Sequence, residues 1–585
     1  MPRRRGASLG HSVGATVPRA CALLSFVVGV LYIESVFFLS PANNDRALRN
    51  KHSHTASFWP MQTSEEPDLV GLVTRLSLAM APFQHSYRSH VAAANGPAPK
   101  ENCKDGLYAH HANTHLNGCP SAGCFKLPTL HDAKKLCSKL KDCGGITESF
   151  PGQFDLQSSS TPEKSSVGET SWVTSNTCIR NVHELVPAIL NSYRNAMVAA
   201  LEDPSLNLNT PLPKTRGDGS IYISVSSYRD NTCGATIRRA LERADHPELL
   251  TIGVVQQNCN FACKMFKMQG DKKKEYPQLH PDPDCLAGLC ESELGRKHCE
   301  AGRIRILRLQ ESEAFGPLFS RFLNAKMWRG ENYYLQIDAH TEFRTGWDST
   351  LKQQIERTPS YPNSVLSNYP PGGSPLHSTE WPRAVPSKTG PPPKALCGVK
   401  ITPSGTVVSM EMRRSDRKLS SQTDLFTPRH SAFVAAGFYF AHGSIVQKVP
   451  FDPFAPFVFS GEEMSLSIRF WTSGFDLYAP SVDVVKHSYY RLNHPKFWET
   501  VDMVFSKRGA FYYLKEAVLP RILHMIGLPD GKKRVKPDLT RLENYQVGRV
   551  RTRAEFAKAV GLDMILQKQT VPTWCVTGEL PPFAK

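Results

Sequence analysis

Tyr333-Tyr334-Leu335-Gln336-Ile337-Asp338-Ala339-His340 joins five mainly apolar residues to an acid and a histidine. The first five predict a buried β-strand, because short apolar and aromatic runs favour strands. Residues two apart in an extended chain point the same way, so Asp338 and His340 can both face a cleft at the end of this strand. A carboxylate and an imidazole together suit manganese or a similar divalent metal. An isolated Asp-x-His also has a structural explanation, since a strand-end acid commonly caps the next element.

Upstream of this strand, the pattern alternates between strands and helices. Residues 221–226 and 250–256 predict strands, and residues 236–244 and 315–328 predict helices. Strand, helix and strand in this order favour a parallel sheet covered by helices. Ligands of such sheets bind beyond the carboxyl ends of the strands. The order therefore predicts a nucleotide-binding α/β domain.

Downstream, Ser460-Gly461-Glu462-Glu463 begins a predicted helix that runs to Trp471. Ser460 and Glu463 have the spacing of a capping box, and acids in a first turn are stabilised by the helix dipole. This structural explanation accounts for Glu463. It leaves Glu462 without one.

Several of these motifs, in this order, resemble one enzyme family. The segment from Tyr333 to Asp348 resembles the Asp-x-His metal signature of retaining GT-A glycosyltransferases that attach α-linked N-acetylhexosamine to polypeptides. The likeness covers residues 219–495 and is greatest to the polypeptide α-N-acetylglucosaminyltransferases, which act on hydroxyproline or on mucin threonines. It implies a metal-dependent, retaining transfer of N-acetylglucosamine from UDP-N-acetylglucosamine to a Thr, Ser or hydroxyproline hydroxyl. In such enzymes retention is attributed to same-face attack assisted by the leaving phosphate.

The resemblance also assigns roles to single residues. It implies that His487 joins Asp338 and His340 as a metal ligand, whereas a lone histidine is more often structural. Glu462 matches the acid that faces sugar and acceptor in related enzymes, and with Asp338 it is a predicted catalytic residue. Arg321 is expected near the diphosphate, with an exposed basic helix face as the alternative. The predicted substrate-binding residues are Ser226, Tyr228, Arg229, Arg321, Arg344, Trp347 and Glu463, the first three near uracil and ribose.

Fourteen of the fifteen cysteines follow residue 100, and this even number favours paired disulfides. Zinc coordination is the alternative, but the spacings are irregular and lack a matching second half. Between Cys103 and Cys178, a helix carrying a cysteine, then Cys143-Gly144-Gly145-Ile146 and a late Trp172, resembles PAN/apple adhesion modules. The resemblance implies a carbohydrate- or protein-binding accessory, and a disulfide-stapled spacer is the alternative.

The N-terminus predicts a membrane anchor. After three arginines, residues 20–39 are mainly apolar and long enough for one membrane-spanning helix. A cleaved signal peptide is the alternative, although its apolar core is usually shorter. Oxidised cysteines after residue 100 require a lumenal location. We therefore expect a type II Golgi membrane protein with a lumenal catalytic domain.

These patterns predict an α/β protein made of six segments. They are a cytosolic tail (1–19), a transmembrane signal anchor (20–40), a disordered stem (41–100), a disulfide-rich PAN/apple-like module (101–180), a GT-A domain (215–495) and a helical C-terminal extension (496–585).

The expected partners are a nucleotide-sugar donor, a polypeptide acceptor and the membrane. A net charge of +17 favours anionic partners, but the charge is dispersed and no recognised nucleic-acid module is present, so nucleic acid is not expected. The alternative function is a lumenal carbohydrate- or protein-binding adhesion protein with an inactive transferase-like domain. The presence of Asp338, His340, Glu462 and His487 speaks against that alternative.

Overall fold

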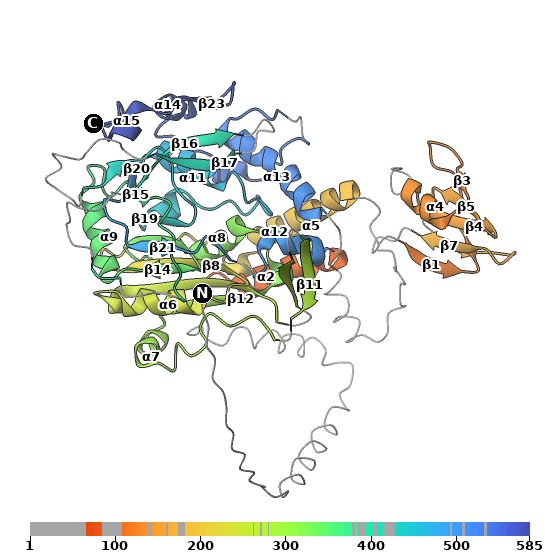
Figure 1. The fold of residues 1–585 in the computed structure, drawn as a ribbon, viewed down its shortest axis with the longest axis horizontal. Coiled ribbons are helices and arrows are strands. Elements are labelled where there is room, and N and C mark those ends of the chain that lie inside the picture. Colours follow the sequence, from red (N-terminus) through yellow and green to blue (C-terminus); the bar gives the residue numbers. More distant parts are fainter. Residues whose placement is uncertain are drawn as a thin grey trace, which may run out of the picture. The chain divides into compact units, whose positions relative to one another are not determined.

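The computed structural model describes residues 66–84, 108–137, 140, 143–159, 162–173, 182–260, 263–269, 272–278, 280–376, 381–383, 393–401, 407–413, 427–491, 494–505, 509–531 and 535–584 (Figure 1). The predicted cytosolic tail and membrane anchor lie outside these residues. Within the described ranges, none of the helices combines the length and the apolar character that crossing a membrane requires.

A mixed eight-stranded sheet forms the centre of the large domain. Its strand order is β12-β9-β8-β13-β19-β15-β20-β18. Strands β12, β9, β8 and β13 run parallel to one another, and β19 runs antiparallel to both β13 and β15. The predicted mixture of strands and helices is confirmed. The strands are β8 Ile221–Tyr228, β9 Leu250–Asn258, β12 Ile304–Gln310, β13 Tyr333–Asp338, β15 Ser364–Ser367, β18 Arg429–His430, β19 Phe438–His442 and β20 Asp476–Ala479.

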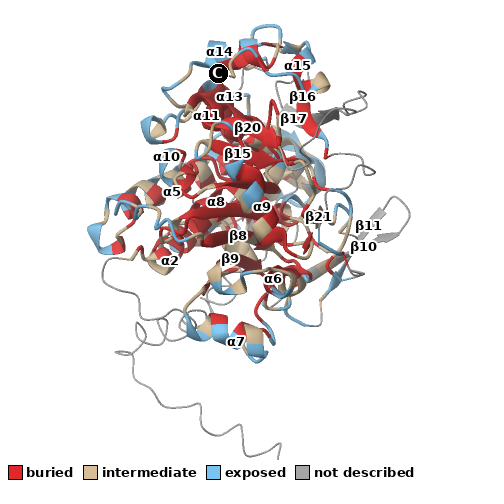
Figure 2. Cartoon of the chain, turned by 90° about the vertical axis from the view of Figure 1, so that its left-hand side faces the viewer, coloured by how far each residue is buried: buried red, intermediate tan, exposed pale blue. Residues whose placement is uncertain are grey.

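Helices cover both faces of this sheet, because alternate side chains of its strands point to opposite faces. Tyr222 and Tyr334 belong to one hydrophobic core together with helices α5, α8, α11 and α13, whereas Ile223 and Leu335 belong to a second core with α6 and α9. Figure 2 shows the central strands almost entirely buried. The helices are α5 Val182–Glu202, α6 Cys233–Glu242, α8 Pro317–Lys326, α9 Trp347–Glu356, α11 Glu462–Thr472 and α13 Ala510–Ile526.

Part of the predicted stem is folded. Helix α2 (Leu69–Met80) carries apolar residues at helical spacing, and Leu72, Leu76 and Met80 are buried in the core that includes α5. The side chain of Asp68 caps the helix by accepting the Gly71 N–H at 2.8 Å. The expectation of a disordered segment from residue 41 to residue 100 is therefore wrong for this helix.

The C-terminal extension shares the main core. Leu514, Phe556 and Trp574 belong to the same hydrophobic cluster as α11, and a disulfide joins Cys397 to Cys575. Residue 495 is therefore not a boundary between cores, and the extension contains short strands as well as helices. Its elements are α12 Phe497–Val504, α13, α14 Arg553–Ala559, β22 Leu562–Asp563, β23 Lys568–Gln569 and α15 Thr573–Thr577.

Residues 108–173 form a separate small sheet of order β1-β7-β4-β5-β3. Helix α4 (Leu130–Cys137) contributes Ala133 to a core with Ile146 and Leu156. The likeness of this module to PAN/apple domains stays a prediction. Its strands are β1 Ala109–Ala112, β2 Thr114–His115, β3 Lys126–Leu127, β4 Gly145–Phe150, β5 Gln153–Gln157, β6 Glu163–Lys164 and β7 Thr170–Val173.

The predicted disulfides are confirmed for the cysteines that the structure describes after residue 100. They pair as Cys119–Cys124, Cys137–Cys143, Cys233–Cys285, Cys259–Cys263, Cys290–Cys299 and Cys397–Cys575. Cys103 and Cys178 lie outside the described residues. The remaining elements of the large domain are β10 Lys264–Gln269, β11 Lys272–Pro277, α7 Glu293–Glu300, β14 Thr341–Phe343, β16 Ala395–Ile401, β17 Val407–Arg413, α10 Ile445–Lys448 and β21 Val485–His487.

Candidate active site

A cavity of about 450 Å³ lies at the carboxyl edge of the central sheet. Strand β8 contributes Ser226 and Tyr228 to its wall, and β13 contributes Asp338. Helix α8, residues 435–437, the first turn of α11 and residues 487–491 complete much of the lining. This is the place where ligands bind in open α/β sheets.

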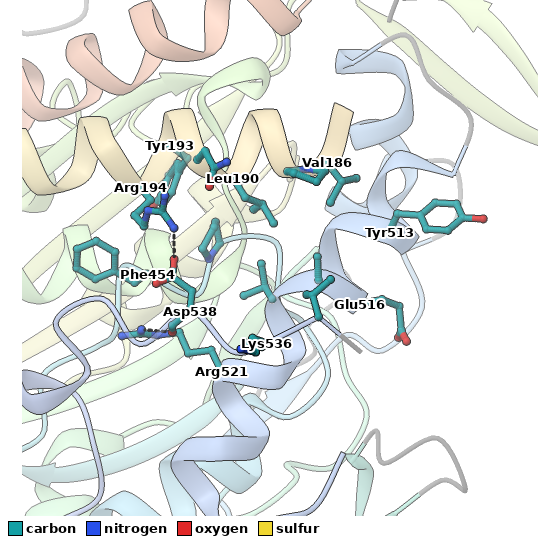
Figure 3. Close-up of a pocket in the computed structure, with 16 residues that line it drawn as sticks. Val186, Leu190, Tyr193, Arg194, Phe454, Tyr513, Glu516, Arg521, Lys536 and Asp538 are labelled. Carbon is teal, nitrogen blue, oxygen red and sulfur yellow. Dashed lines mark hydrogen bonds and ion pairs between the residues drawn. The ribbon is translucent and has the colours of Figure 1, made fainter. Parts of the chain in front are cut away.

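A second cavity, of about 490 Å³, lies between α5 and α13 (Figure 3). Its lining is mainly apolar and includes Leu190 and Phe454. Figure 3 shows Arg194 directed at Asp538, with 3.6 Å between Nη1 and Oδ2. Among the described residues, the one cluster of metal-ligating side chains lies in the first cavity, which is therefore the better candidate for catalysis.

Asp338, His340 and His487 converge in this first cavity. Their potential ligand atoms all lie within 4.8 Å of one another. The Nε2 atom of His487 is 3.0 Å from Asp338 Oδ2, and the Nε2 atom of His340 is 3.8 Å from the same oxygen. Strand β14 pairs with β21 so that Thr341 lies opposite His487, and this pairing brings His487 beside the end of β13. The structure thus joins the three predicted ligands, and their binding of a metal stays a prediction.

The three side chains fit a divalent cation. One carboxylate and two imidazoles are a common donor set for such metals. Gly437 leaves the space beside them open, because a Cβ on this residue would lie 2.9 Å from Asp338 Oδ2 and 3.7 Å from His487 Nε2. Burial raises the pKa of Asp338, but the hydrogen bond with His487 and the neighbouring positive charges outweigh burial and hold it well below its ordinary value. The carboxylate is therefore ionised at neutral pH, as metal binding requires.

Arg321 is buried between two acids at the cavity wall. Its guanidinium pairs with the carboxylate of Glu462 and lies 3.4 Å from Asp338 Oδ1. It also donates a hydrogen bond of 3.1 Å to the carbonyl oxygen of Ala436. The alternative of an exposed basic helix face is wrong, since only 5% of this residue is exposed. The cavity thus contains a fixed positive charge beside its acids.

Glu462 and Glu463 both line the cavity, but the predicted capping box is absent. Helix α11 has Gly461, with φ 98°, as its N-cap residue. The carboxylate of Glu463 instead accepts hydrogen bonds from the Ala436 N–H at 3.0 Å and from the Tyr369 hydroxyl at 2.5 Å. Burial raises the pKa of Glu463 above its ordinary value. The expectation that Glu463 caps its own helix is therefore wrong, and its position in the cavity fits a substrate contact.

Ser226 and Tyr228 line the cavity as predicted, whereas Arg229 does not. Arg229, directly after β8, has a left-handed φ of 47°. Its guanidinium is completely buried and pairs with Asp282 at 2.8 Å and with Glu311 at 2.9 Å. We therefore correct its predicted role from substrate contact to ion-pair centre.

Arg344 and Trp347 are also absent from the cavity lining. The guanidinium of Arg344 lies over the ring of Trp381, 4.5 Å from its centroid. Trp347 is fully buried in the core of α6 and α9, where its Nε1 donates to the Ala240 carbonyl oxygen at 2.9 Å. The predicted substrate-binding roles of both residues are corrected, because packing and stacking occupy their side chains.

Several residues of the cavity are not predicted from the sequence, among them Asp230, Phe459 and Trp498. Asp230 lies 2.8 Å from the Nδ1 atom of His340, and the signal that points to it is an acid directly after an opening strand. Phe459 and Trp498 lie at the cavity with 49% and 38% of their surface exposed and with ring centroids 4.6 Å apart. No sequence pattern predicts this aromatic pair, because its two residues come from separate segments of the chain.

Asp483, which precedes β21, gives a stability prediction. Burial raises its pKa to about 6 in the folded protein, although Asn368 donates a hydrogen bond of 2.8 Å to it. The folded state therefore holds this proton more tightly than the unfolded state, whose pKa is near 3.8. The contribution of Asp483 to stability falls as the pH rises from about 4 to about 6, and stays low above that range.

Asp483→Asn is thus expected to raise the free energy of unfolding by about 3 kcal/mol at pH 7 and by much less at pH 4. Urea unfolding of both proteins at the two pH values measures the difference. An equal gain at pH 4 and pH 7 would show that the carboxylate does not titrate as described.

The model of the family described as Glycosyltransferase (GlcNAc) matches residues 220–566. Among solved structures, the crystal structure of GalNAc-T7 with UDP, GalNAc and Mn²⁺ is similar with a TM-score of 0.35 and 14% identity, over 63% of this chain and 64% of that one. The chain thus spans less than two thirds of that structure. The crystal structure of S. aureus TarS 1-349 in complex with UDP is similar with a TM-score of 0.26 and 12% identity, over 52% of this chain and 72% of that one. No curated protein matches the chain.

Proposed function

Because the chain belongs to the Glycosyltransferase (GlcNAc) family, we propose that it transfers N-acetylglucosamine in α linkage from UDP-N-acetylglucosamine to a Thr, Ser or hydroxyproline hydroxyl of a polypeptide. The observation that carries this proposal is the convergence of Asp338, His340 and His487 in a cavity at the carboxyl edge of the sheet. The family match supports glycosyl transfer. The donor, the linkage and the acceptor are our extension of it.

Asp338, His340 and His487 would hold a divalent cation, for which we propose manganese. Such a cation neutralises negative charge on a departing nucleotide diphosphate. The guanidinium of Arg321 adds a positive charge to the same cavity. Glu462 and the Ala436 carbonyl oxygen hold this guanidinium in place. A charge that is fixed before the reaction costs no reorganisation when the diphosphate leaves.

We assign Glu462 to the sugar and acceptor side of the cavity. Positive charge develops on the sugar ring as the bond to the diphosphate breaks, and a buried carboxylate stabilises that charge. The acceptor hydroxyl forms the new bond to the anomeric carbon on the face that the diphosphate leaves, and its proton passes to a phosphate oxygen. This course gives retention without a covalent intermediate, so no nucleophile is assigned.

The exposed aromatic pair supports a polypeptide acceptor. Phe459 and Trp498 offer apolar surface in the cavity that Glu462 also lines, and Lys496 lies 5.7 Å from the ring centroid of Trp498. Exposed aromatic rings in a cavity are typical of binding sites rather than of cores. We propose that the acceptor segment lies across these two rings.

Trp498→Ala is expected to raise the KM for an acceptor peptide about fivefold and to change the KM for the donor less than twofold, because one ring contact contributes about 1 kcal/mol. Steady-state kinetics with each substrate varied in turn measures the two constants. Tyr512→Ala removes a ring of similar exposure, 48%, that lies outside the cavity lining, and serves as the matched control. Equal increases in the KM values for donor and acceptor would show that the Trp498 ring does not act specifically in acceptor binding.

We also propose that the protein is a single-pass type II membrane protein of the Golgi, with its catalytic domain in the lumen. The described disulfides support an oxidising compartment. The proposed anchor, residues 20–40, lies outside the described residues. For the module of residues 101–180 we propose a carbohydrate- or protein-binding accessory role.

Hydrolysis of a panel of UDP-hexosamines tests the proposed function. Purified full chain with Mn²⁺ is expected to release UDP from UDP-N-acetylglucosamine at least about tenfold faster than from UDP-N-acetylgalactosamine or UDP-glucose, and chelation is expected to stop the release. A preference for another sugar would correct the donor. Failure to release UDP from any donor would favour an adhesion protein with an inactive domain.

A further inference from the structure

Asp230 is a buried acid in direct contact with one of the three clustered residues. It follows β8, and only 3% of it is exposed. Its Oδ2 atom lies 2.8 Å from the Nδ1 atom of His340. Since a carboxylate accepts hydrogen bonds, Nδ1 carries the proton of a neutral His340 ring. The lone pair is then on Nε2, which is the atom that faces Asp338.

The carboxylate of Asp230 is itself held in a fixed orientation. Its Oδ1 atom accepts hydrogen bonds from the Thr232 N–H at 2.9 Å and from the Thr232 hydroxyl at 2.7 Å. On the other side, Arg491 Nε lies 3.3 Å from Oδ2. Arg491 is in turn anchored, because its Nη2 atom donates to the Tyr228 carbonyl oxygen at 2.9 Å. Both oxygens of Asp230 therefore have partners.

Arg491 also connects this acid to the third clustered residue. It lies four positions after His487, on the segment that leaves β21 along the cavity. The ion pair with Asp230 therefore links the chain that carries His487 to the end of β8, while the Asp230–His340 contact links β8 to the end of β13. One buried carboxylate after β8 thus connects the two segments that build the cluster.

We propose that Asp230 is a positioning residue of a divalent-cation site, where it sets the tautomer and ring orientation of His340 and is held for that task by Arg491. This assignment rests on the proposed function, since it presupposes a cation shared by Asp338, His340 and His487. A purely structural role, in which Asp230 and Arg491 only form a buried ion pair, is the competing explanation. The two explanations differ in what they expect for metal affinity.

Isothermal titration of the purified full chain with MnCl₂ alone, without nucleotide, tests the assignment. Asp230→Asn keeps the size of the side chain but removes its charge, and it is expected to raise the Kd for Mn²⁺ about tenfold. Asp230→Ala removes the partner of Nδ1 entirely and is expected to raise the Kd up to about 100-fold. Thermal unfolding of each variant shows whether it is folded, and the asparagine variant keeps the test valid if the alanine variant is not.

Asp452→Asn provides the matched control. Asp452 is similarly buried, with 2% exposed, and pairs with Arg521 at 2.7 Å and 3.1 Å. It does not line the cavity that contains Asp338. Its substitution is expected to lower the unfolding temperature and to leave the Kd for Mn²⁺ within threefold of wild type. An equal rise in Kd for Asp452→Asn and Asp230→Asn would overturn the assignment, because general loosening would then explain both.

The remaining outcomes separate this assignment from the function on which it rests. Wild-type affinity in both Asp230 variants, in a protein that binds Mn²⁺, would overturn the positioning role and leave the proposed function standing. Failure of the wild-type chain itself to bind Mn²⁺ would overturn both.

Discussion

Asp338→Ala is expected to lower the Mn²⁺-dependent release of UDP from UDP-N-acetylglucosamine roughly 1000-fold. Asp338 is the one carboxylate in the cluster with His340 and His487, and its Oδ2 atom lies near both imidazoles. Without it, two imidazoles remain, and neither supplies negative charge to offset a divalent cation. The substitution also removes the contact between Asp338 and Arg321. Among the described contacts of this guanidinium, Glu462 is then the acidic partner that remains.

A second substitution distinguishes a loss of activity from a loss of the folded state. Asp338→Asn keeps the shape of the side chain, so the protein is expected to fold, but a neutral amide oxygen is a much weaker metal ligand than a carboxylate. Both variants are compared with wild type by UDP release at saturating Mn²⁺ and by thermal unfolding. Activity above a tenth of wild type in a folded Asp338→Ala protein would remove Asp338 from the reaction.

Gly437→Ala is expected both to raise the Mn²⁺ concentration that gives half-maximal activity and to lower the maximal rate. The ratio of the maximal rate to that concentration is expected to fall about 100-fold. The added Cβ would lie 2.9 Å from Asp338 Oδ2, a separation that real Cβ atoms essentially never show. Either the carboxylate or the backbone of residues 435–437 must then move. In both cases the space beside Asp338 and His487 is filled by a methyl group.

Gly372→Ala is the matched control for this substitution. Gly372 forms a β-bridge with His487 and is therefore close to the same ligand in the fold, yet a Cβ there would meet no atom within 4 Å. We expect its activity and Mn²⁺ dependence to stay within twofold of wild type. Titration of UDP release with MnCl₂ measures both variants, and a wild-type metal dependence in Gly437→Ala would show that the cation does not occupy this space.

The sheet is predictable from the sequence because its central strands are short, apolar and separated by helical segments. Strands β8, β9 and β13 all follow this pattern, and Asp338 lies at the end of β13 as predicted. His340 lies in the turn that follows β13, so the turn and not strand alternation brings it beside Asp338. His487 is different. Its approach depends on the pairing of β14 with β21, a long-range contact that only the family likeness anticipated.

Other features depend on contacts that no local pattern reveals. Arg229 leaves the cavity because Asp282 and Glu311, both distant in sequence, surround it. Trp347 begins helix α9 directly after Gly346, which has a φ of 70°, and its indole is buried in the core of α6 and α9. Helix α2 has apolar residues at helical spacing, but the polar residues on both sides of it favour an unfolded segment when the sequence is considered alone.

X-ray diffraction at the manganese absorption edge, from crystals of the protein grown with MnCl₂ and UDP, shows whether Asp338, His340 and His487 share one cation. We expect one anomalous peak at about 2.2 Å from a carboxylate oxygen of Asp338 and from the Nε2 atoms of His340 and His487. An anomalous peak bound elsewhere, or no peak among these three side chains, would contradict it.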